Sequence, residues 1–263
     1  MFRFCSLFSG SSGNCLFVQS DTTKILIDCG ESAKKIVTAL SQIDINIEDI
    51  NGLLITHEHS DHVKSLGTLS KKYNLPIYIN KETFEALSEQ KDKIKPENIN
   101  YFDFKKNFFV GDLEIHPFST PHDAANSCGF NIFRGKDKMS IATDLGHVTP
   151  EILSTLEQSK FILLESNYDP NTLKCSSYPY PLKERIAGPY GHLSNETAGK
   201  TISYLMNHGL ETAMLGHLSK ENNFPELAYK TVMEEIMYNT KSENTINLSV
   251  ATRFTPTPFI NIG

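Results

Sequence analysis

The chain has 263 residues, and a formal net charge of −6 excludes recognition of a polyanion by attraction to the whole surface. The length suits one domain over residues 1–263. No apolar run reaches about 18 residues, which excludes a membrane-spanning helix, and no signal peptide is expected because polar turn residues follow Phe8. The five cysteines are an odd number without paired spacing, so we expect reduced thiols and a cytoplasmic protein.

The first half of the sequence predicts a β-meander followed by alternating helices and strands. Short apolar runs are separated by turn residues such as SGSSGN. Strands are expected at 2–8, 15–20, 24–28, 53–56 and 76–79. Helices are expected at 32–40, 62–73 and 80–87, the last of them capped by Asn80.

The second half predicts a similar order. Strands are expected at 107–118, 129–134, 139–143, 161–165, 212–215 and 246–250. Helices are expected from Thr149-Pro150-Glu151, at 194–207 and at 225–237. Two similar halves predict an α/β fold in which two mixed β-sheets pack face to face with helices on the outer faces, an αββα sandwich.

One stretch, LLITHEHSDHVKSL at 53–66, places three histidines and an aspartate where a buried strand meets a helix. In an extended segment His57 and His59 point to the same side, so both can reach one ion. Asp61 and His62, at the helix start, can point toward a second ion. Such ligands suit zinc, manganese or iron. A polar loop that only caps the helix would need one of these residues and would not explain the histidines.

Three more candidate ligands end apolar runs later in the chain: His122, Asp144 and His217. Taken singly, either histidine could be structural, and Asp144 could be an ordinary turn residue. Their occurrence together with the dense cluster favours the metal-binding interpretation.

This ligand pattern, H-x-H-x-D-H and then His, Asp and His, resembles the metallo-β-lactamase superfamily. The motifs SGSSGNC, LIDCG, TPHDAANSCGF, ATDLG, LESNYD, YPYPLKERI, GHLSN and GHLSKENN, in this order, resemble its bacterial YycJ/WalJ/VicX-like branch over nearly the whole chain. The resemblance implies a metallo-β-lactamase fold and two divalent metal ions, which would acidify a water to act as the nucleophile near neutral pH.

The resemblance also implies a role for each candidate ligand. One metal site would comprise His57, His59 and His122, the other Asp61, His62 and His217, and Asp144 would bridge the two ions. Asp28 would support the metal-binding loop through hydrogen bonds, although an ordinary turn before Gly30 would explain it equally well. Asp61 and His192 are the predicted catalytic residues.

His192, in GPYGHLSN, lies where phosphodiesterases of this superfamily carry an extra histidine that binds no metal. There it can contact the scissile phosphate or protonate the leaving oxygen, because an alkoxide leaves poorly without a proton. Ser194 and the helix that begins there could offer backbone N–H groups to a phosphate. The alternative for His192 is a loop residue beside a helix cap.

The segment 168–190 interleaves tyrosines with cations, a combination that holds single-stranded nucleic acid. We therefore predict that Tyr168, Lys183 and Arg185 contact the substrate together with His192 and Ser194. A solvated helix face with a few tyrosines is the alternative.

The same ligands hydrolyse lactams, thioesters, lactones and phosphodiesters in different relatives. The span from Asp144 to His217 is too short for the inserted domain of β-CASP nucleases, and the segment after His217 is too short for the helical region typical of glyoxalase II. The resemblance implies a dinuclear phosphodiesterase that acts on nucleic acid, namely a 5′-end-directed DNA exonuclease linked to repair. The alternative is a small-molecule hydrolase of a thioester, lactone or cyclic phosphodiester. The oligomeric state is left open.

Overall fold

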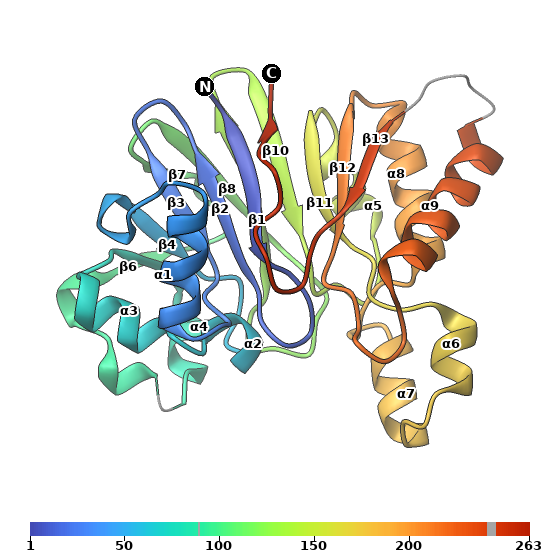
Figure 1. Cartoon of the computed structure of the whole chain (residues 1–263), viewed down its shortest axis with the longest axis horizontal. Coiled ribbons are helices and arrows are strands. Elements are labelled where there is room, and N and C mark those ends of the chain that lie inside the picture. Colours follow the sequence, from blue (N-terminus) through green and yellow to red (C-terminus); the bar gives the residue numbers. More distant parts are fainter. Residues whose placement is uncertain (89, 241–245) are drawn as a thin grey trace.

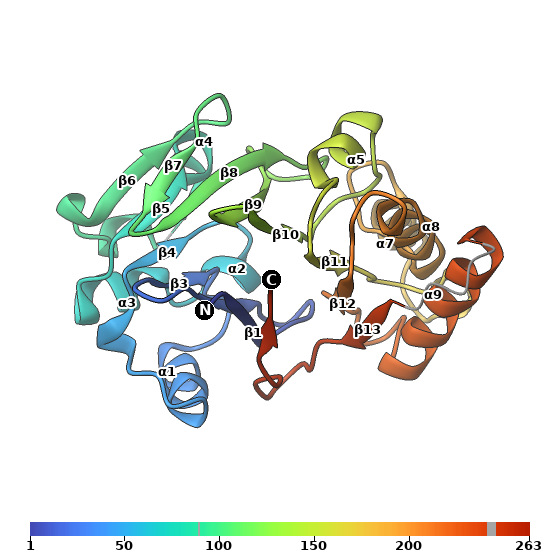
Figure 2. The ribbon, with the colours of Figure 1, turned by 90° about the horizontal axis from the view of Figure 1, so that it is seen from above.

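The computed structural model describes residues 1–88, 90–240 and 246–263. In this part of the chain two seven-stranded β-sheets pack face to face, with helices on their outer faces (Figures 1 and 2). The strand orders are β14-β1-β2-β3-β4-β5-β6 and β13-β12-β11-β10-β9-β8-β7. The predicted αββα sandwich is confirmed.

The first sheet begins as an antiparallel meander and continues as parallel strands from β3 to β6. Its strands are β1 (Arg3–Phe8), β2 (Cys15–Gln19), β3 (Lys24–Ile27), β4 (Gly52–Leu54), β5 (Ile77–Asn80), β6 (Ile99–Phe102) and β14 (Ile260–Asn261). Its outer face is covered by α1 (Ala33–Gln42), α3 (Leu66–Tyr73) and α4 (Lys81–Ala86). Short 3₁₀ turns occur at Ile47–Asp49, Lys91–Lys93 and Pro96–Asn98.

The second sheet is antiparallel from β7 to β10 and parallel from β10 to β13. Its strands are β7 (Phe108–Val110), β8 (Leu113–Ser119), β9 (Cys128–Arg134), β10 (Asp137–Ala142), β11 (Phe161–Glu165), β12 (Thr212–Gly216) and β13 (Asn247–Val250). Helices α5 (Pro150–Leu156), α8 (Asn195–Met206) and α9 (Pro225–Thr240) cover it. Two short helices, α6 (Pro170–Cys175) and α7 (Tyr180–Ala187), extend from one end of the sandwich (Figure 1).

The inner faces of the two sheets form a continuous apolar core. Phe4 of β1 and Phe161 of β11 meet there with ring centroids 4.7 Å apart, and both side chains are almost completely buried. Burying side chains of this size stabilises the fold by roughly 1.5–3 kcal/mol each. The sandwich therefore provides a rigid support for the loops at its ends. None of the described helices has the length and apolar character that a bilayer span requires.

Two predicted elements were wrong in detail. The expected strand at 107–118 is a hairpin, because Gly111 turns the chain with φ +57° and packs so closely on Thr23 that a Cβ atom would not fit. The expected helix at 62–73 is two helices, α2 (Ser60–Val63) and α3. They separate at Ser65, whose N–H donates to Cys29 O instead of to a helical carbonyl. The elements α6, α7, β6 and β14 were not predicted.

The carboxyl ends of the parallel strands meet at one end of the sandwich, the lower end in Figure 1. Asp28 follows β3, and Asp144 and His217 follow β10 and β12. All three adopt a left-handed backbone conformation, with φ of 62°, 56° and 54°. Asp and His tolerate this region better than bulky residues, and such strain often marks functional sites.

Candidate metal centre

The loop after β4 carries the dense histidine cluster, and Asp28 holds this loop in place. Thr56 donates to Asp28 through its N–H at 2.9 Å and its hydroxyl at 2.8 Å, and His62 Nδ1 lies 2.7 Å from Asp28 Oδ2. Because a carboxylate only accepts hydrogen bonds, His62 carries a proton on Nδ1 and turns Nε2 toward the centre, where it lies 3.1 Å from Asn14 Nδ2. This is the geometry that the predicted supporting role of Asp28 requires.

The amino-terminal SGSSGN turn braces the same loop from the other side. Asn14 N–H donates to Asp61 O at 2.8 Å, and Gly30 N–H donates to Asn14 O at 2.8 Å. A Cβ atom on Gly30 would lie 1.6 Å from Asp61 O, so only glycine permits this close approach. The turn lacks the Gly-Lys-Ser/Thr ending of a phosphate-binding loop. Its contacts with the metal-binding loop give it a structural role.

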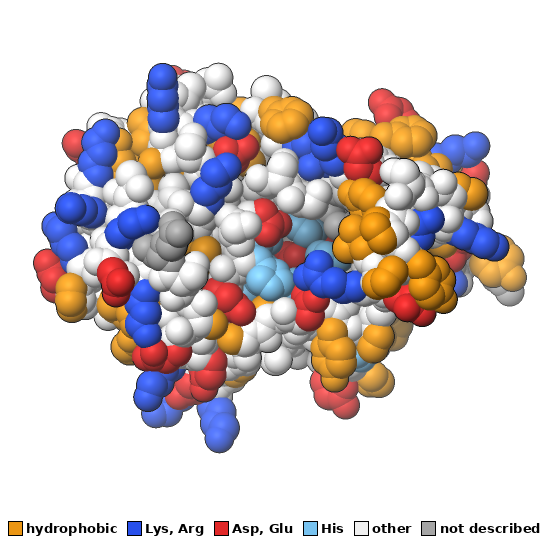
Figure 3. Space-filling model, turned by 90° about the horizontal axis from the view of Figure 1, so that it is seen from below, with side chains coloured by type: hydrophobic (Ala, Val, Ile, Leu, Met, Phe, Trp, Pro, Cys, Tyr) orange, Lys and Arg blue, Asp and Glu red, His pale blue; other side chains and the backbone are white. Residues whose placement is uncertain are grey.

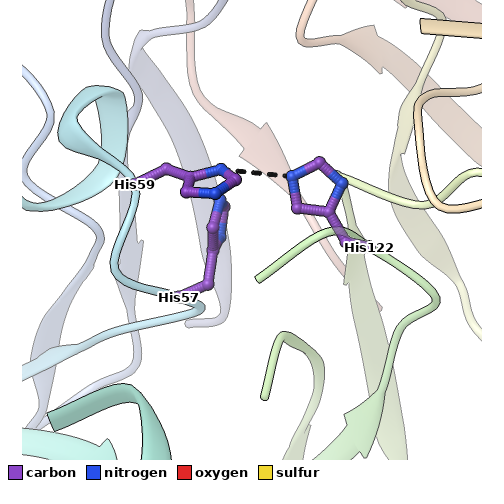
Figure 4. Close-up of side chains that lie close together, drawn as sticks. All are labelled: His57, His59 and His122. Atoms are coloured by element: carbon purple, nitrogen blue, oxygen red, sulfur yellow. Dashed lines mark hydrogen bonds between the residues drawn. The ribbon is translucent and has the colours of Figure 1, made fainter. Parts of the chain in front are cut away.

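The first predicted site brings together His57, His59 and His122, whose ligand atoms all lie within 4.8 Å of one another. In Figure 4 the rings of His59 and His122 point toward each other edge to face, and the ring nitrogens joined by the dashed line are 3.3 Å apart. His122 Nδ1 donates to Gly191 O at 3.1 Å, which leaves its Nε2 for a metal ion. Burial lowers the pKa of His57 well below its usual value, and a metal ligand must be neutral.

The second predicted site brings together Asp61, His62 and His217, again within 4.8 Å. Asp61 Oδ2 lies 3.4 Å from Nε2 of both histidines. Burial raises the pKa of Asp61, but the charge of His62 and a hydrogen bond from His217 lower it more. The pKa of this carboxyl group is therefore well below its usual range. Although burial lowers the pKa of His62 and His217, the Asp144 carboxylate raises it well above its usual value for His62 and to about 10 for His217. A bound cation would displace these protons and leave an ionised carboxylate and two neutral imidazoles, a donor set that divalent metals accept.

Asp144 lies between the two groups. Its Oδ1 is 3.8 Å from His122 Nε2 and 3.6 Å from His217 Nε2, and its Oδ2 is 3.3 Å from His62 Nε2. Asp144 Oδ2 and His57 Nε2 are buried and have no hydrogen-bond partner among the residues that the structure describes. Leaving buried polar atoms unpaired costs about 1–3 kcal/mol each. Divalent cations bound here would satisfy both, so the residues fit the ions that the ligand pattern implies.

Comparison with known proteins agrees with this geometry. Residues 23–218 match the family described as "Beta-lactamase superfamily domain". The chain belongs to the metallo-β-lactamase superfamily. It is 35% identical to Exodeoxyribonuclease WalJ of Streptococcus pneumoniae serotype 2, over 89% of this chain and 88% of that protein. It is also 35% identical to Exodeoxyribonuclease YycJ of Bacillus anthracis, over 88% of each chain. The fold resembles the metallo-β-lactamase fold protein YhfI of Bacillus subtilis, with a TM-score of 0.68 at 17% identity, covering 99% of this chain and 100% of that one.

A buried glutamate that was not predicted from the sequence, Glu165, contacts the centre. Its Oε1 accepts from His217 Nδ1 at 2.7 Å and from His192 Nδ1 at 2.8 Å. Its Oε2 accepts from the N–H groups of Leu145 and Leu193 at 3.1 and 3.0 Å. Glu165 is the last residue of β11, beside β10 and β12, and this position in the motif LESNYD is the signal that could have revealed it.

His192 lies at the edge of the cluster, where it was predicted to act without binding metal. Its ring centroid is 5.2 Å from that of His122 and 5.3 Å from that of His217. Although burial lowers the pKa of His192, the Glu165 carboxylate raises it above its usual value. The hydrogen bond to Glu165 holds a proton on Nδ1 and fixes the orientation of the ring.

The four remaining residues that were predicted to bind substrate lie in different surroundings. Arg185 is exposed and forms two hydrogen bonds with Asp123, the neighbour of His122, at 2.5 and 3.1 Å, so it stands beside the metal centre. Lys183 Nζ instead caps α6, donating to Lys174 O and Ser176 O.

Tyr168 and Ser194 lie inside the protein. Tyr168 is 8% exposed and packs with Leu173 and Ile186, which leaves no ring face for a base. Ser194 is buried and caps α8, accepting from Thr197 N–H at 3.2 Å, and Asn195 N–H donates to Tyr168 O. The expected phosphate-binding N–H groups are therefore largely occupied. Packing against α6 and α7, two helices that were not predicted, explains the burial of Tyr168.

Glu165→Gln is expected to loosen both histidines at once. The amide would present N–H groups either to the histidine donors or to the backbone donors of Leu145 and Leu193, so one pair would be mismatched. Metal affinity should fall about 10- to 100-fold, as for other residues that orient metal ligands. Competitive chelator titration measures it, with Glu157→Gln as the control, because the half-buried Glu157 directly after α5 also accepts a hydrogen bond but contacts no candidate ligand among the described residues. Unchanged metal affinity would contradict the orienting role.

Proposed function

We propose that this protein is a metal-dependent exodeoxyribonuclease, which hydrolyses phosphodiester bonds at the end of a DNA strand. The observation that carries the proposal is its 35% identity with proteins named exodeoxyribonuclease over nearly nine-tenths of the chain. The centre described above is compatible with this activity, because Asp144 lies between two neighbouring groups of candidate metal ligands.

The metal ions and the protein would contribute different parts of the reaction. Two bound divalent cations would supply an activated water and neutralise charge on the phosphate. The predicted histidine ligands would hold those ions, and their Nδ1 atoms are fixed by Asp28, Gly191 and Glu165. A preorganised site of this kind avoids reorganisation during the reaction.

His192 provides the proton that the leaving oxygen needs. Hydrolysis forms a bond between water oxygen and phosphorus and breaks the bond from phosphorus to the leaving sugar oxygen. That oxygen departs as an alcohol if it receives a proton as the bond breaks, and positioned general acids contribute about 10²- to 10⁴-fold. Because Glu165 stabilises the protonated ring, His192 suits this role.

The direct test measures hydrolysis by the metal-reconstituted protein. Substrates are single-stranded and double-stranded DNA and RNA of the same sequence, labelled at either the 5′ or the 3′ end, with a thioester and bis-p-nitrophenyl phosphate as controls. We expect stepwise shortening of DNA, and we predict release of mononucleotides from the 5′ end. Reconstitution with zinc, manganese and iron in turn identifies the active ion. Hydrolysis of the thioester without cleavage of DNA would refute the proposal.

The resemblance also supports narrower proposals about the cell. A protein that trims DNA ends fits a role in repair, and its five unpaired cysteines, four of them buried, fit the reducing cytoplasm. Sensitivity of a deletion strain to DNA-damaging agents, and fractionation of the tagged protein, test these two points separately.

A further inference from the structure

A cavity of about 540 Å³ lies beside the metal centre. It is lined by residues from the loops that follow β1, β12 and β13. Two lining residues adjoin His217: Ser9 Oγ accepts from the backbone N–H of His217 at 2.8 Å, and Leu218 follows His217 in the chain. The cavity therefore lies next to the segment that carries His217. Figure 3 views this end of the molecule, with the histidines in a hollow that is rimmed by charged and hydrophobic side chains.

Two phenylalanines on the cavity wall are unusually exposed. Phe224 is 52% exposed and Phe254 is 64% exposed, and neither ring belongs to a hydrophobic cluster of the described residues. Exposing an aromatic side chain forgoes the free energy of its burial. Packing within the fold does not explain the two rings, but a flat partner such as a nucleobase would cover them.

Cations accompany the two rings. Lys220 is exposed on the cavity wall, and the guanidinium of Arg253 donates to Leu218 O at 2.6 Å. Burial lowers the pKa of Arg253, yet an arginine in a protein remains charged. Among the described residues that line the cavity there is no aspartate or glutamate, although the whole chain carries a net charge of −6. The cavity is thus locally complementary to a phosphate-bearing chain.

The lining of this cavity differs in charge from that of another cavity, which lies on the His122 side of the centre. A cavity of about 560 Å³ beside His122 is lined by Glu151 and by no described lysine or arginine. By contrast, Phe254 also lines a third cavity, which contains Lys34 and Lys35 of α1. Cations therefore line both cavities on the His217 side, although Lys35 is paired with Glu31 at 2.9 Å.

We propose that the cavity formed by Phe224, Phe254, Lys220 and Arg253 binds single-stranded DNA next to the nucleotide being cleaved. Bases stack on the two rings, and backbone phosphates lie near the cations. This inference rests on the proposed function and adds the course of the strand across the surface. Stacking uses the face that all bases share, so the site accepts any sequence.

The test compares Phe224→Ala, Phe254→Ala and the double variant with the wild-type holoenzyme on a single-stranded oligonucleotide. We expect each single change to raise KM about 5- to 100-fold, the range found for loss of one base–aromatic stack. Turnover of bis-p-nitrophenyl phosphate, which has no bases, should be unchanged. Phe109→Ala is the matched control, because Phe109 is 65% exposed on the edge strand β7.

A second measurement tests the charged part of the proposal. Removing one phosphate contact should reduce the slope of log affinity against log salt by about 0.7 for single strands. Lys220→Ala should show this change, whereas Lys136→Ala, in the β9–β10 turn at the opposite end of the sheet, should not.

The outcomes separate this inference from the function on which it rests. If the wild-type enzyme degrades DNA and the double variant has the KM of Phe109→Ala, the cavity does not bind the strand and the inference is overturned. If the wild-type enzyme degrades no DNA, the proposed function fails, and the inference fails with it. Increased KM with unchanged small-substrate turnover supports both.

Discussion

Asp144→Asn is expected to remove metal and nuclease activity together. Asp144 reaches members of both ligand groups, and its Oδ2 is buried without a hydrogen-bond partner among the described residues. An amide carries no charge and can offer one oxygen only, so it cannot bridge two cations. Activity on DNA should fall on the order of 10³-fold or more, because the water activation and charge stabilisation that the cations supply depend on their binding. Metal content per chain and the rate of nucleotide release are the measurements.

This substitution should leave the fold intact, which makes the result interpretable. Position 144 has φ 56°, and asparagine adopts that region at least as readily as aspartate. Asp137→Asn, at the other end of β10, is the matched control and should behave as wild type. An Asp144→Asn protein that retained two ions per chain and full activity would disprove the bridging role.

His192→Ala is expected to reduce turnover while sparing the metal. His192 is not one of the predicted ligands, and its Nδ1 is held by Glu165 at 2.8 Å. Loss of a general acid should slow cleavage of DNA about 10²- to 10⁴-fold. The effect on bis-p-nitrophenyl phosphate should be much smaller, because p-nitrophenolate departs without protonation. Comparison of kcat on the two substrates therefore isolates proton transfer.

A structural role for His192 would give a different result. If the ring only filled space, both substrates would be affected equally. If it bound metal, the metal content would fall as in Asp144→Asn. His208→Ala, just after the far end of α8, is the control for removing a histidine. Full activity of His192→Ala on DNA would refute the catalytic assignment.

The local part of the site could be predicted because its residues are close in sequence. Residues 57–62 supply several donors within one loop, and the alternation of an extended chain already places His57 and His59 on the same side. Strand ends were also predictable, since β11 has the expected bounds and the strands before Asp144 and His217 end where apolar runs end. The αββα architecture followed from the family resemblance and the alternation of elements, whereas the strand order within each sheet was not predicted.

Other features depend on contacts between distant segments, which no local pattern encodes. Glu165 accepts from His192 and His217, which lie 27 and 52 positions away. Its sequence context, the end of an apolar strand, is equally typical of a turn. The identity of its partners follows only from the parallel pairing of β11 with β10 and β12.

The sequence by itself determined the fold class and the candidate ligands, because hydrophobic periodicity and the clustering of metal-binding side chains are local properties. Only the tertiary structure decided which side chains face the substrate. Tyr168 looked exposed beside cations but is buried by α6 and α7, whereas Phe224 and Phe254 remain exposed in one cavity although 30 positions separate them. Exposure depends on what packs against a side chain, and packing partners come together only when the whole chain folds.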